Sequence, residues 1–207
     1  MDNIQQGTPE WLKLRLGKIT ASRIIDVLAQ GKTGESLTRK KYKNDLVRQR
    51  MTGLLSESYT NPAMQRGIEL EPLARASYEI KHNLMVDQIS FVNHPTIKMA
   101  GASPDGLVNE DGLIEIKCPS PDNHIDNLIN DEAPKKYFPQ MQWQMACTGR
   151  KWCDFISFDP DTNEHLRMLV KRVDRDDEWI KNTEQEVIKF NQEIEDAITR
   201  LNNIKFE

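Results

Sequence analysis

Two carboxylates and a lysine stand at a spacing that suits phosphodiester hydrolysis. Asp105 lies in the run Ser-Pro-Asp-Gly, and Glu115 and Lys117 follow in the run Glu-Ile-Lys. In a β-strand, Glu115 and Lys117 share one face, while the isoleucines beside them point to the other face. Carboxylates bind hard divalent cations such as Mg²⁺, which polarise a phosphoryl group and activate water, and an ammonium group can orient that water or offset developing charge. The three residues therefore predict metal-assisted hydrolysis, and a surface hairpin with a solvated Glu/Lys pair is the alternative.

The segment between the two runs predicts a β-hairpin that brings these groups together. If residues 110–112 form a three-residue loop with the final glycine in the left-handed conformation, Leu107 faces Glu115. In the same register Asp105 faces Lys117, so the two carboxylates and the lysine converge on one face.

Periodicity and capping residues predict the elements that position this hairpin. Three of the expected helices span 20–31, 38–53 and 134–148. Three more are predicted by their first residues, at Thr8-Pro9, Asn61-Pro62 and Arg175. The expected strands cover residues 84–92, 97–102, 113–118, 152–158 and 165–173. This order predicts an α/β protein in which a mixed central sheet is flanked by helices, built as a single domain over 1–207.

Composition and charge limit the classes of protein to which the chain can belong. The 207 residues are 38% hydrophobic and 29% charged, a composition typical of globular proteins. The net charge of -4 has the wrong sign for a protein that coats nucleic acid non-specifically. Bases concentrate in residues 39–50, so one surface can be basic. No apolar run suits a membrane span or a signal peptide, so we expect a cytoplasmic protein without membrane contact. We expect three reduced cysteines, and the four scattered histidines are assigned to no metal.

Five ordered motifs surround the two runs. They are Gly-Lys-Ile-Thr-Ala-Ser at 17–22 after Trp11 and Arg15, Gly-Ile-Glu-Leu-Glu-Pro at 67–72 with Ala74, Arg75 and Tyr78, Ser-Pro-Asp-Gly at 103–106, Glu-Ile-Lys-Cys-Pro at 115–119, and Tyr137 with Gln140 and Gln142. Together they resemble the phage lambda exonuclease, or YqaJ-type viral recombinase, family of PD-(D/E)xK nucleases. The resemblance extends over residues 5–160 and implies a restriction-endonuclease-like fold.

The resemblance implies a role for each matching position. It implies two Mg²⁺ ions, for which Mn²⁺ can substitute, bound by Asp105, Glu115 and the carbonyl of Ile116. Lys117 matches the catalytic lysine. The assisting catalytic residues would be Glu71 and Gln140. Some relatives carry another aspartate before the Ser-Pro-Asp-Gly motif, where this chain has Pro95, so it departs from that pattern at the outer shell of the second metal.

The resemblance also implies residues that bind DNA. Arg15, Ser22 and Ser103 match a pocket for the terminal 5′-phosphate, Tyr137 borders the active site, and Met64 matches an apolar wedge that separates the terminal base pairs. An arginine fork and a serine at a helix start both suit a phosphate. Each of these residues also has a structural alternative. Arg15 would be a surface arginine, Ser22 a plain helix-start residue and Met64 a core residue. Glu71 would be a solvated glutamate, and Tyr137 and Gln140 would hold ordinary helix-surface positions.

The implied function is a Mg²⁺-dependent exonuclease that degrades one strand of double-stranded DNA from its 5′ end. It would release mononucleotides and leave 3′ single-stranded tails for recombination by single-strand annealing. A structure-specific or sequence-specific endonuclease and a non-catalytic DNA-end-binding scaffold are the alternatives. The resemblance further implies a homotrimeric ring around DNA and a phage single-strand annealing protein as partner, in a phage or prophage protein of a bacterial host cell. Bases such as Lys40, Lys41, Lys43 and Arg48 could line the ring.

Overall fold

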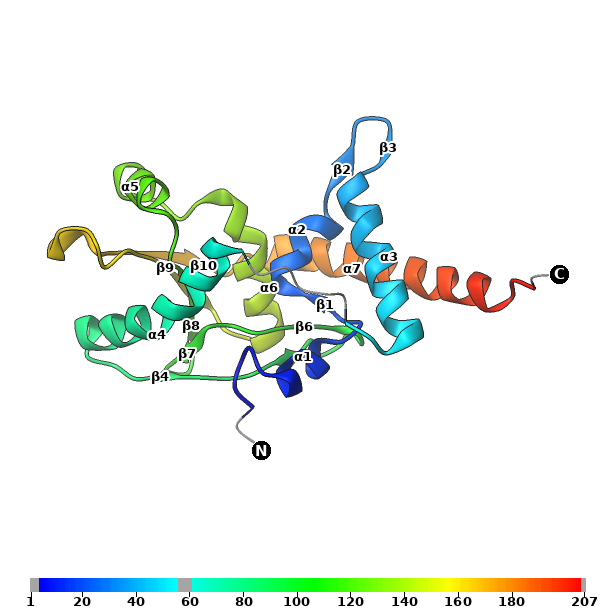
Figure 1. The fold of residues 1–207 in the computed structure, drawn as a ribbon, viewed down its shortest axis with the longest axis horizontal. Helices are drawn as coiled ribbons and strands as arrows, with labels where there is room; N and C mark the ends of the chain where they lie inside the picture. Colours follow the sequence, from blue (N-terminus) through cyan, green and yellow to red (C-terminus); the bar gives the residue numbers. More distant parts are fainter. Residues whose placement is uncertain (1–3, 56–60, 206–207) are drawn as a thin grey trace.

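The computed structural model describes residues 4–55 and 61–205. Within them a five-stranded mixed sheet has the order β10-β9-β8-β7-β4, with a parallel β8–β9 pair and antiparallel pairs elsewhere (Figure 1). Its strands are β4 (Val86–Asp87), β7 (Gly106–Val108), β8 (Gly112–Lys117), β9 (Trp152–Phe158) and β10 (Met168–Asp174). A smaller sheet has the order β1-β6-β5, from β1 (Ile19–Thr20), β6 (Ala100–Ala102) and β5 (Val92–Asn93), and β2 (Gln30–Gly31) pairs with β3 (Gly34–Glu35).

Helices cover both faces of the five-stranded sheet, as the predicted fold class requires. The α-helices are α1 (Pro9–Arg15), α2 (Ile24–Val27), α3 (Leu37–Thr52), α4 (Pro62–His82), α5 (Pro121–Asn130), α6 (Phe138–Thr148) and α7 (Asp177–Asn202), and 3₁₀ turns cover η1 (Ala21–Arg23), η2 (Lys135–Tyr137) and η3 (Glu164–Leu166). Tyr78 of α4 belongs to the same buried cluster as Ile114 and Ile156. On the opposite face, α6 buries Met145 in a cluster with Leu113. The sheet is therefore enclosed between α4 and α6.

Local sequence explains where the predicted helices begin. Thr8 accepts a hydrogen bond from the Trp11 amide at the start of α1, and Asn61 accepts one from Met64 at the start of α4. Each is followed by a proline, whose fixed φ suits the first helical position. Both predicted starts are confirmed.

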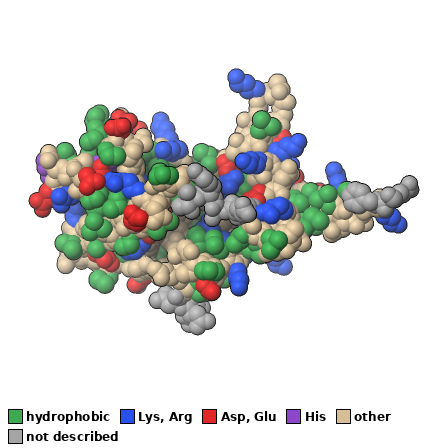
Figure 2. All heavy atoms as spheres, in the orientation of Figure 1, with side chains coloured by type: hydrophobic (Ala, Val, Ile, Leu, Met, Phe, Trp, Pro, Cys, Tyr) green, Lys and Arg blue, Asp and Glu red, His purple; other side chains and the backbone are tan. Residues whose placement is uncertain are grey.

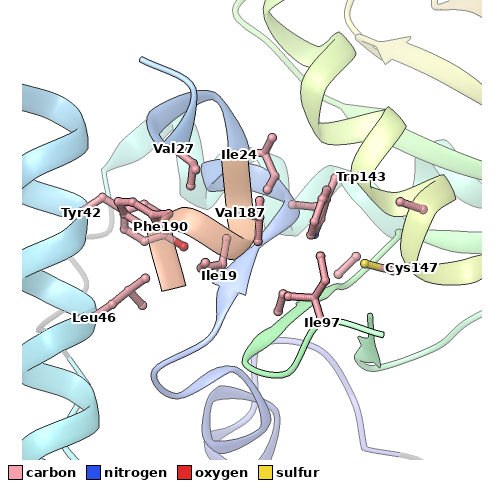
Figure 3. Close-up of a cluster of buried hydrophobic side chains, with 14 of the residues drawn as sticks. Ile19, Ile24, Val27, Tyr42, Leu46, Ile97, Trp143, Cys147, Val187 and Phe190 are labelled. Atoms are coloured by element: carbon pink, nitrogen blue, oxygen red, sulfur yellow. The ribbon is translucent and has the colours of Figure 1, made fainter. Parts of the chain in front are cut away.

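A second core lies between α2, α3, α6 and α7 (Figure 3). Tyr42 of α3 stacks on Phe190 of α7 with ring centroids 5.8 Å apart, and Trp143 of α6 is fully buried in the same cluster. Burying side chains of this size contributes about 1.5–3 kcal/mol each. Arg39 and Lys43 of α3 also bind Glu193 of α7, so the long final helix fixes α3 to the molecule.

The hairpin forms, but in a register that differs from the prediction by two residues. Leu107 pairs with Leu113, not with Glu115, and the loop is 109–111, in which Asn109 takes the left-handed φ of 47°. Gly112 is the first residue of β8, and a Cβ there would stand 2.1 Å from the Trp152 ring. The glycine serves a close packing contact, not the turn. A shift of two residues leaves every side chain on its predicted face.

Three other elements also differ from the prediction. The expected strand 84–92 breaks into β4, which pairs with β7, and β5, which pairs with β6 of the smaller sheet. The expected helix 20–31 is a 3₁₀ turn and one turn of α-helix, followed by β2. Helix α5 was not predicted.

The three cysteines agree with the expected reduced state. Cys118, Cys147 and Cys153 are unpaired and buried, and burial raises the pKa of the Cys118 thiol to about 12. No helix in the described part of the chain is both long and apolar enough to span a membrane.

Candidate active site

Glu115 sits in the middle of β8 with its side chain turned toward α6. It is fully buried, and its two carboxylate oxygens each accept a hydrogen bond at 2.6 Å, Oε1 from Gln140 Nε2 and Oε2 from Gln144 Nε2. Lys117 forms an ion pair with Oε1. Glu115 is therefore a positioned, desolvated carboxylate, which excludes a solvated Glu/Lys pair on a surface hairpin.

Asp105 reaches the same place from the turn between β6 and β7. Its Oδ2 accepts a hydrogen bond of 2.6 Å from the Ile116 amide, so the carboxylate lies at the edge of β8 beside Glu115. Burial raises the pKa of the Asp105 carboxyl well above its usual range, and the charges of Glu115 and Glu71 raise it further. The negative charges of Glu115 and Glu71 therefore act on Asp105, and a cation bound beside it would relieve this repulsion.

Arg75 of α4 connects Glu71 to this turn. Its Nε donates a hydrogen bond of 3.2 Å to the backbone carbonyl of Asp105, and its Nη2 forms an ion pair with Glu71. Arg75 is buried, so the contact is held by packing as well as by charge. The helix therefore positions the predicted Glu71 through a residue whose role the sequence did not indicate.

Lys117 remains protonated in this setting. Burial lowers the pKa of its ammonium, but the negative charges of Glu115 and Asp105 outweigh that effect and raise the pKa above its ordinary value. Its Nζ also lies 5.1 Å from the centre of the Tyr137 ring. The group can donate hydrogen bonds and offset negative charge, but it is no general base at neutral pH.

A second polar cluster lies next to the carboxylates. Arg15 Nη1 donates a hydrogen bond of 3.4 Å to Ser103 Oγ, and Trp11 Nε1 donates one of 3.0 Å to the same oxygen. The guanidinium stacks 4.2 Å from the Trp11 ring, and burial lowers the pKa of Arg15. Within residues 4–55 and 61–205, no carboxylate forms an ion pair with Arg15. A desolvated cation without an anion is costly, so this cluster is suited to an anionic ligand.

The remaining predicted DNA-binding residues are only partly brought together. Ser22, Tyr137 and Gln140 line one hollow between η1 and α6, although Ser22 is at a 3₁₀ turn and not in the first turn of an amphipathic helix. Met64 is half exposed in the first turn of α4. This is an exposed position and not the core packing that was the alternative.

The donors at the site fit a hard divalent cation. The Asp105 and Glu115 carboxylates supply oxygen, and the carbonyl of Ile116 points to the same edge of β8 as its amide, toward Asp105. Among the described residues, no group of three His, Cys, Asp or Glu side chains stands close enough to hold a metal. The set fits a cation only if the Ile116 carbonyl and substrate or water oxygens complete it.

The sequence analysis did not predict the contact between Gln144 and Glu115. It follows Gln140 by one turn of α6, and residues four apart share a helix face. That spacing was the signal that could have predicted the Gln144 contact. Gln142, which belongs to the motif, bonds instead to Asp174 and Asp176.

Several known proteins resemble this chain in sequence or in fold. The YqaJ-like viral recombinase domain matches residues 10–151. The chain is 46% identical to the alkaline exonuclease LHK-Exo from Laribacter hongkongensis, whose crystal structure matches with a TM-score of 0.87 over 94% of this chain and 96% of that one. The complex of LHK-Exo with dAMP matches with a TM-score of 0.88. A phage-related exonuclease from Haemophilus somnus 129PT, 17% identical, shares the fold with a TM-score of 0.73 over 89% of this chain and 96% of that one.

A viral protein is also related. The uncharacterized protein R354 of Acanthamoeba polyphaga mimivirus is 26% identical over 181 residues, or 81% of this chain and 31% of that protein. The chain thus spans about a third of that relative's length. The match to the recombinase domain covers more than half of the chain, and the motifs that it contains form one site. The chain therefore belongs to the YqaJ-like viral recombinase family, which its ordered motifs had predicted.

Proposed function

We propose that the chain is a Mg²⁺-dependent exonuclease that degrades one strand of double-stranded DNA from its 5′ end. The observation that carries the proposal is the position of the Arg15–Ser103 cluster. Ser103 and Asp105 are two residues apart, so their Cα atoms lie at most about 7 Å from each other. An anion bound by Arg15 and Ser103 is therefore held beside the carboxylates. A terminal 5′-phosphate in that cluster places the first phosphodiester bonds of its strand at Asp105 and Glu115.

Each residue of the site has a separate role in this proposal. Asp105, Glu115 and the Ile116 carbonyl would hold the cations. When bound there, divalent cations polarise the phosphoryl oxygens and lower the pKa of water. The Lys117 ammonium orients the attacking water and offsets charge on the phosphoryl group. Gln140 keeps one oxygen of Glu115 in place, and Glu71 assists from α4.

The named relatives support the same chemistry. The 46% identical LHK-Exo is an alkaline exonuclease and forms a complex with dAMP. A deoxynucleoside monophosphate is the product expected when a strand is degraded one nucleotide at a time. We therefore propose that mononucleotides are released and that a 3′ single-stranded tail remains for annealing.

We also propose the assembly that the family resemblance implied. A homotrimeric ring would keep a chain with net charge -4 on DNA, and its partner would be a single-strand annealing protein of the same phage or prophage. Figure 2 shows Lys and Arg side chains over α3 and the β2–β3 hairpin. Lys40 and Lys41 are exposed there, whereas Lys43 is bound to Glu35 and Glu193. Lys43 is therefore less available to DNA than its neighbours.

Digestion of labelled duplexes tests the proposal. Linear duplex carrying a 5′ label on one strand should release labelled mononucleotide only when Mg²⁺ is present, and the opposite strand should persist. Covalently closed circular duplex should remain intact. Cutting of the circle would favour an endonuclease, and binding without cutting would favour the non-catalytic scaffold.

A further inference from the structure

Gln144 binds the oxygen of Glu115 that Gln140 does not bind. Its Nε2 donates a hydrogen bond of 2.6 Å to Oε2 of Glu115, and its side chain is fully buried. Gln140 donates to Oε1 from one turn earlier and is only half-buried. The two amides of α6 therefore hold the carboxylate from one side, each through its own oxygen.

The other end of the Gln144 amide is left unsatisfied. Its Oε1 is buried, and no hydrogen bond to it occurs within the described part of the chain. The opposite orientation of the amide would place Oε1 against the Glu115 carboxylate, where two acceptors repel. A buried acceptor without a donor is unfavourable for folding, so the amide is oriented for Glu115 and not for the stability of α6.

We infer that Gln144 is a positioning residue that keeps Glu115 in one orientation throughout turnover. Gln140 lines the hollow with Ser22 and Tyr137, so substrate can contact its amide and weaken its bond to Glu115. Gln144 is closed off from that hollow and keeps its bond. This division of roles rests on the proposed nuclease function, because only there does the orientation of Glu115 determine the rate.

Substituting Gln144→Met tests the inference, because methionine matches glutamine in length and removes both the donor and the unsatisfied acceptor. The substitution also leaves Oε2 of the buried Glu115 without its donor, so we expect the unfolding temperature of the metal-free protein to fall. The kcat should fall about 10- to 100-fold, the usual effect of losing a hydrogen bond to a charged group, while KM for DNA stays unchanged. Calorimetric titration with Mg²⁺ alone should show weaker binding than to the wild type, which is a readout independent of cleavage.

Gln142→Met is the matched control, since Gln142 is equally buried on the same helix. Its Nε2 donates to the Asp174 carbonyl at 2.8 Å and its Oε1 accepts from the Asp176 amide at 2.9 Å, so it joins α6 to the connection between β10 and α7. This variant should unfold at a lower temperature but keep the kcat and the Mg²⁺ affinity of the wild type in its folded fraction.

The outcomes separate this inference from the proposed function. A wild type that cleaves no DNA would refute the nuclease, and the Mg²⁺ titration would still test Gln144. A wild type that cleaves, together with an unchanged kcat and Mg²⁺ affinity in Gln144→Met, would overturn the positioning role. If Gln144→Met does not fold, the more compact Gln144→Leu takes its place, and loss of the fold in both would make Gln144 a structural residue instead.

Discussion

Arg15 provides the most direct test of strand polarity, because it separates recognition of a 5′ end from general binding of DNA. If Arg15 and Ser103 hold a terminal phosphate, wild-type protein should digest a 5′-phosphorylated duplex faster than a 5′-hydroxyl duplex. A hydrogen bond to a charged group contributes about 1.5–3 kcal/mol, which corresponds to roughly 10- to 100-fold in rate. Arg15→Ala should therefore bring the phosphorylated substrate down to the hydroxyl rate and change the hydroxyl rate little.

The structure predicts that this variant stays folded. Arg15→Ala loses the stacking on Trp11, at 4.2 Å from the ring centre, which contributes about 0.5–2 kcal/mol. It also removes the cost of a desolvated cation that has no carboxylate partner within the described residues. The two effects oppose each other, so the free energy of unfolding should change by less than about 2 kcal/mol.

Single-turnover digestion of the two duplexes at saturating protein measures the effect without product release. Lys13→Ala is the matched control, because Lys13 is an exposed cation on the same short helix, and it should leave the ratio of the two rates unchanged. If Arg15→Ala slowed both substrates equally, or if the wild type did not distinguish them, Arg15 would be a general backbone contact. The 5′ polarity would then lose its structural basis.

Three further predictions concern charge and packing. Burial raises the pKa of Asp105, so its ionised form destabilises the fold. Asp105→Asn should therefore abolish cleavage but raise the unfolding temperature of the metal-free protein at pH 7. In calorimetry this gain should disappear below pH 3.8, the ordinary pKa of the carboxyl, where the wild-type Asp105 is protonated in both the folded and the unfolded state. A less stable variant at pH 7 would contradict this. Gly112→Val puts a Cβ 2.1 Å from Trp152 and should cost about 1–3 kcal/mol in urea unfolding; an unchanged midpoint would refute the packing role. Lys41→Gln should lower by about one the slope of log binding constant against log salt concentration for DNA. Lys43→Gln should mainly destabilise the protein, because the ion pairs of Lys43 fix α3. The reverse result would place Lys43 on the DNA.

The convergence of the proposed catalytic residues could be predicted because it depends on strand alternation alone. Glu115 and Lys117 share a face in any register, and a slip of two residues preserves that face. The register itself could not be predicted, because Gly112 suits both a left-handed turn and a strand position under a large ring. Only the position of Trp152, which is distant in sequence, decides between them.

Other features depend on contacts that a single sequence does not show. Residues 84–92 alternate as one strand, but β4 and β5 pair with strands of two different sheets. Helix α5 was predictable in principle, since Ser120 and Pro121 form a helix start of the kind used correctly at Thr8-Pro9. Ile125, Leu128 and Ile129 also lie on one face of this helix, so its periodicity was a second available signal. The one fully buried side chain is His124, which bonds to Ser157 and to the Leu166 carbonyl.

The hairpin register also explains why the motif at the site contains proline followed by aspartate. Pairing of β7 with β8 ends with Gly106 opposite Ile114. Continued in the same antiparallel register, it would place Asp105 opposite Glu115 and Pro104 opposite Ile116. Proline has no N–H to donate, and its carbonyl accepts a hydrogen bond of 2.8 Å from Gln6 instead, so the ladder stops there. Asp105 replaces the missing acceptor and takes the Ile116 amide at 2.6 Å. The Ile116 carbonyl, which points to the same edge, receives no ladder donor from Pro104 and stays available beside two carboxylates. The interrupted ladder therefore creates the oxygen-rich edge that the proposed cations require.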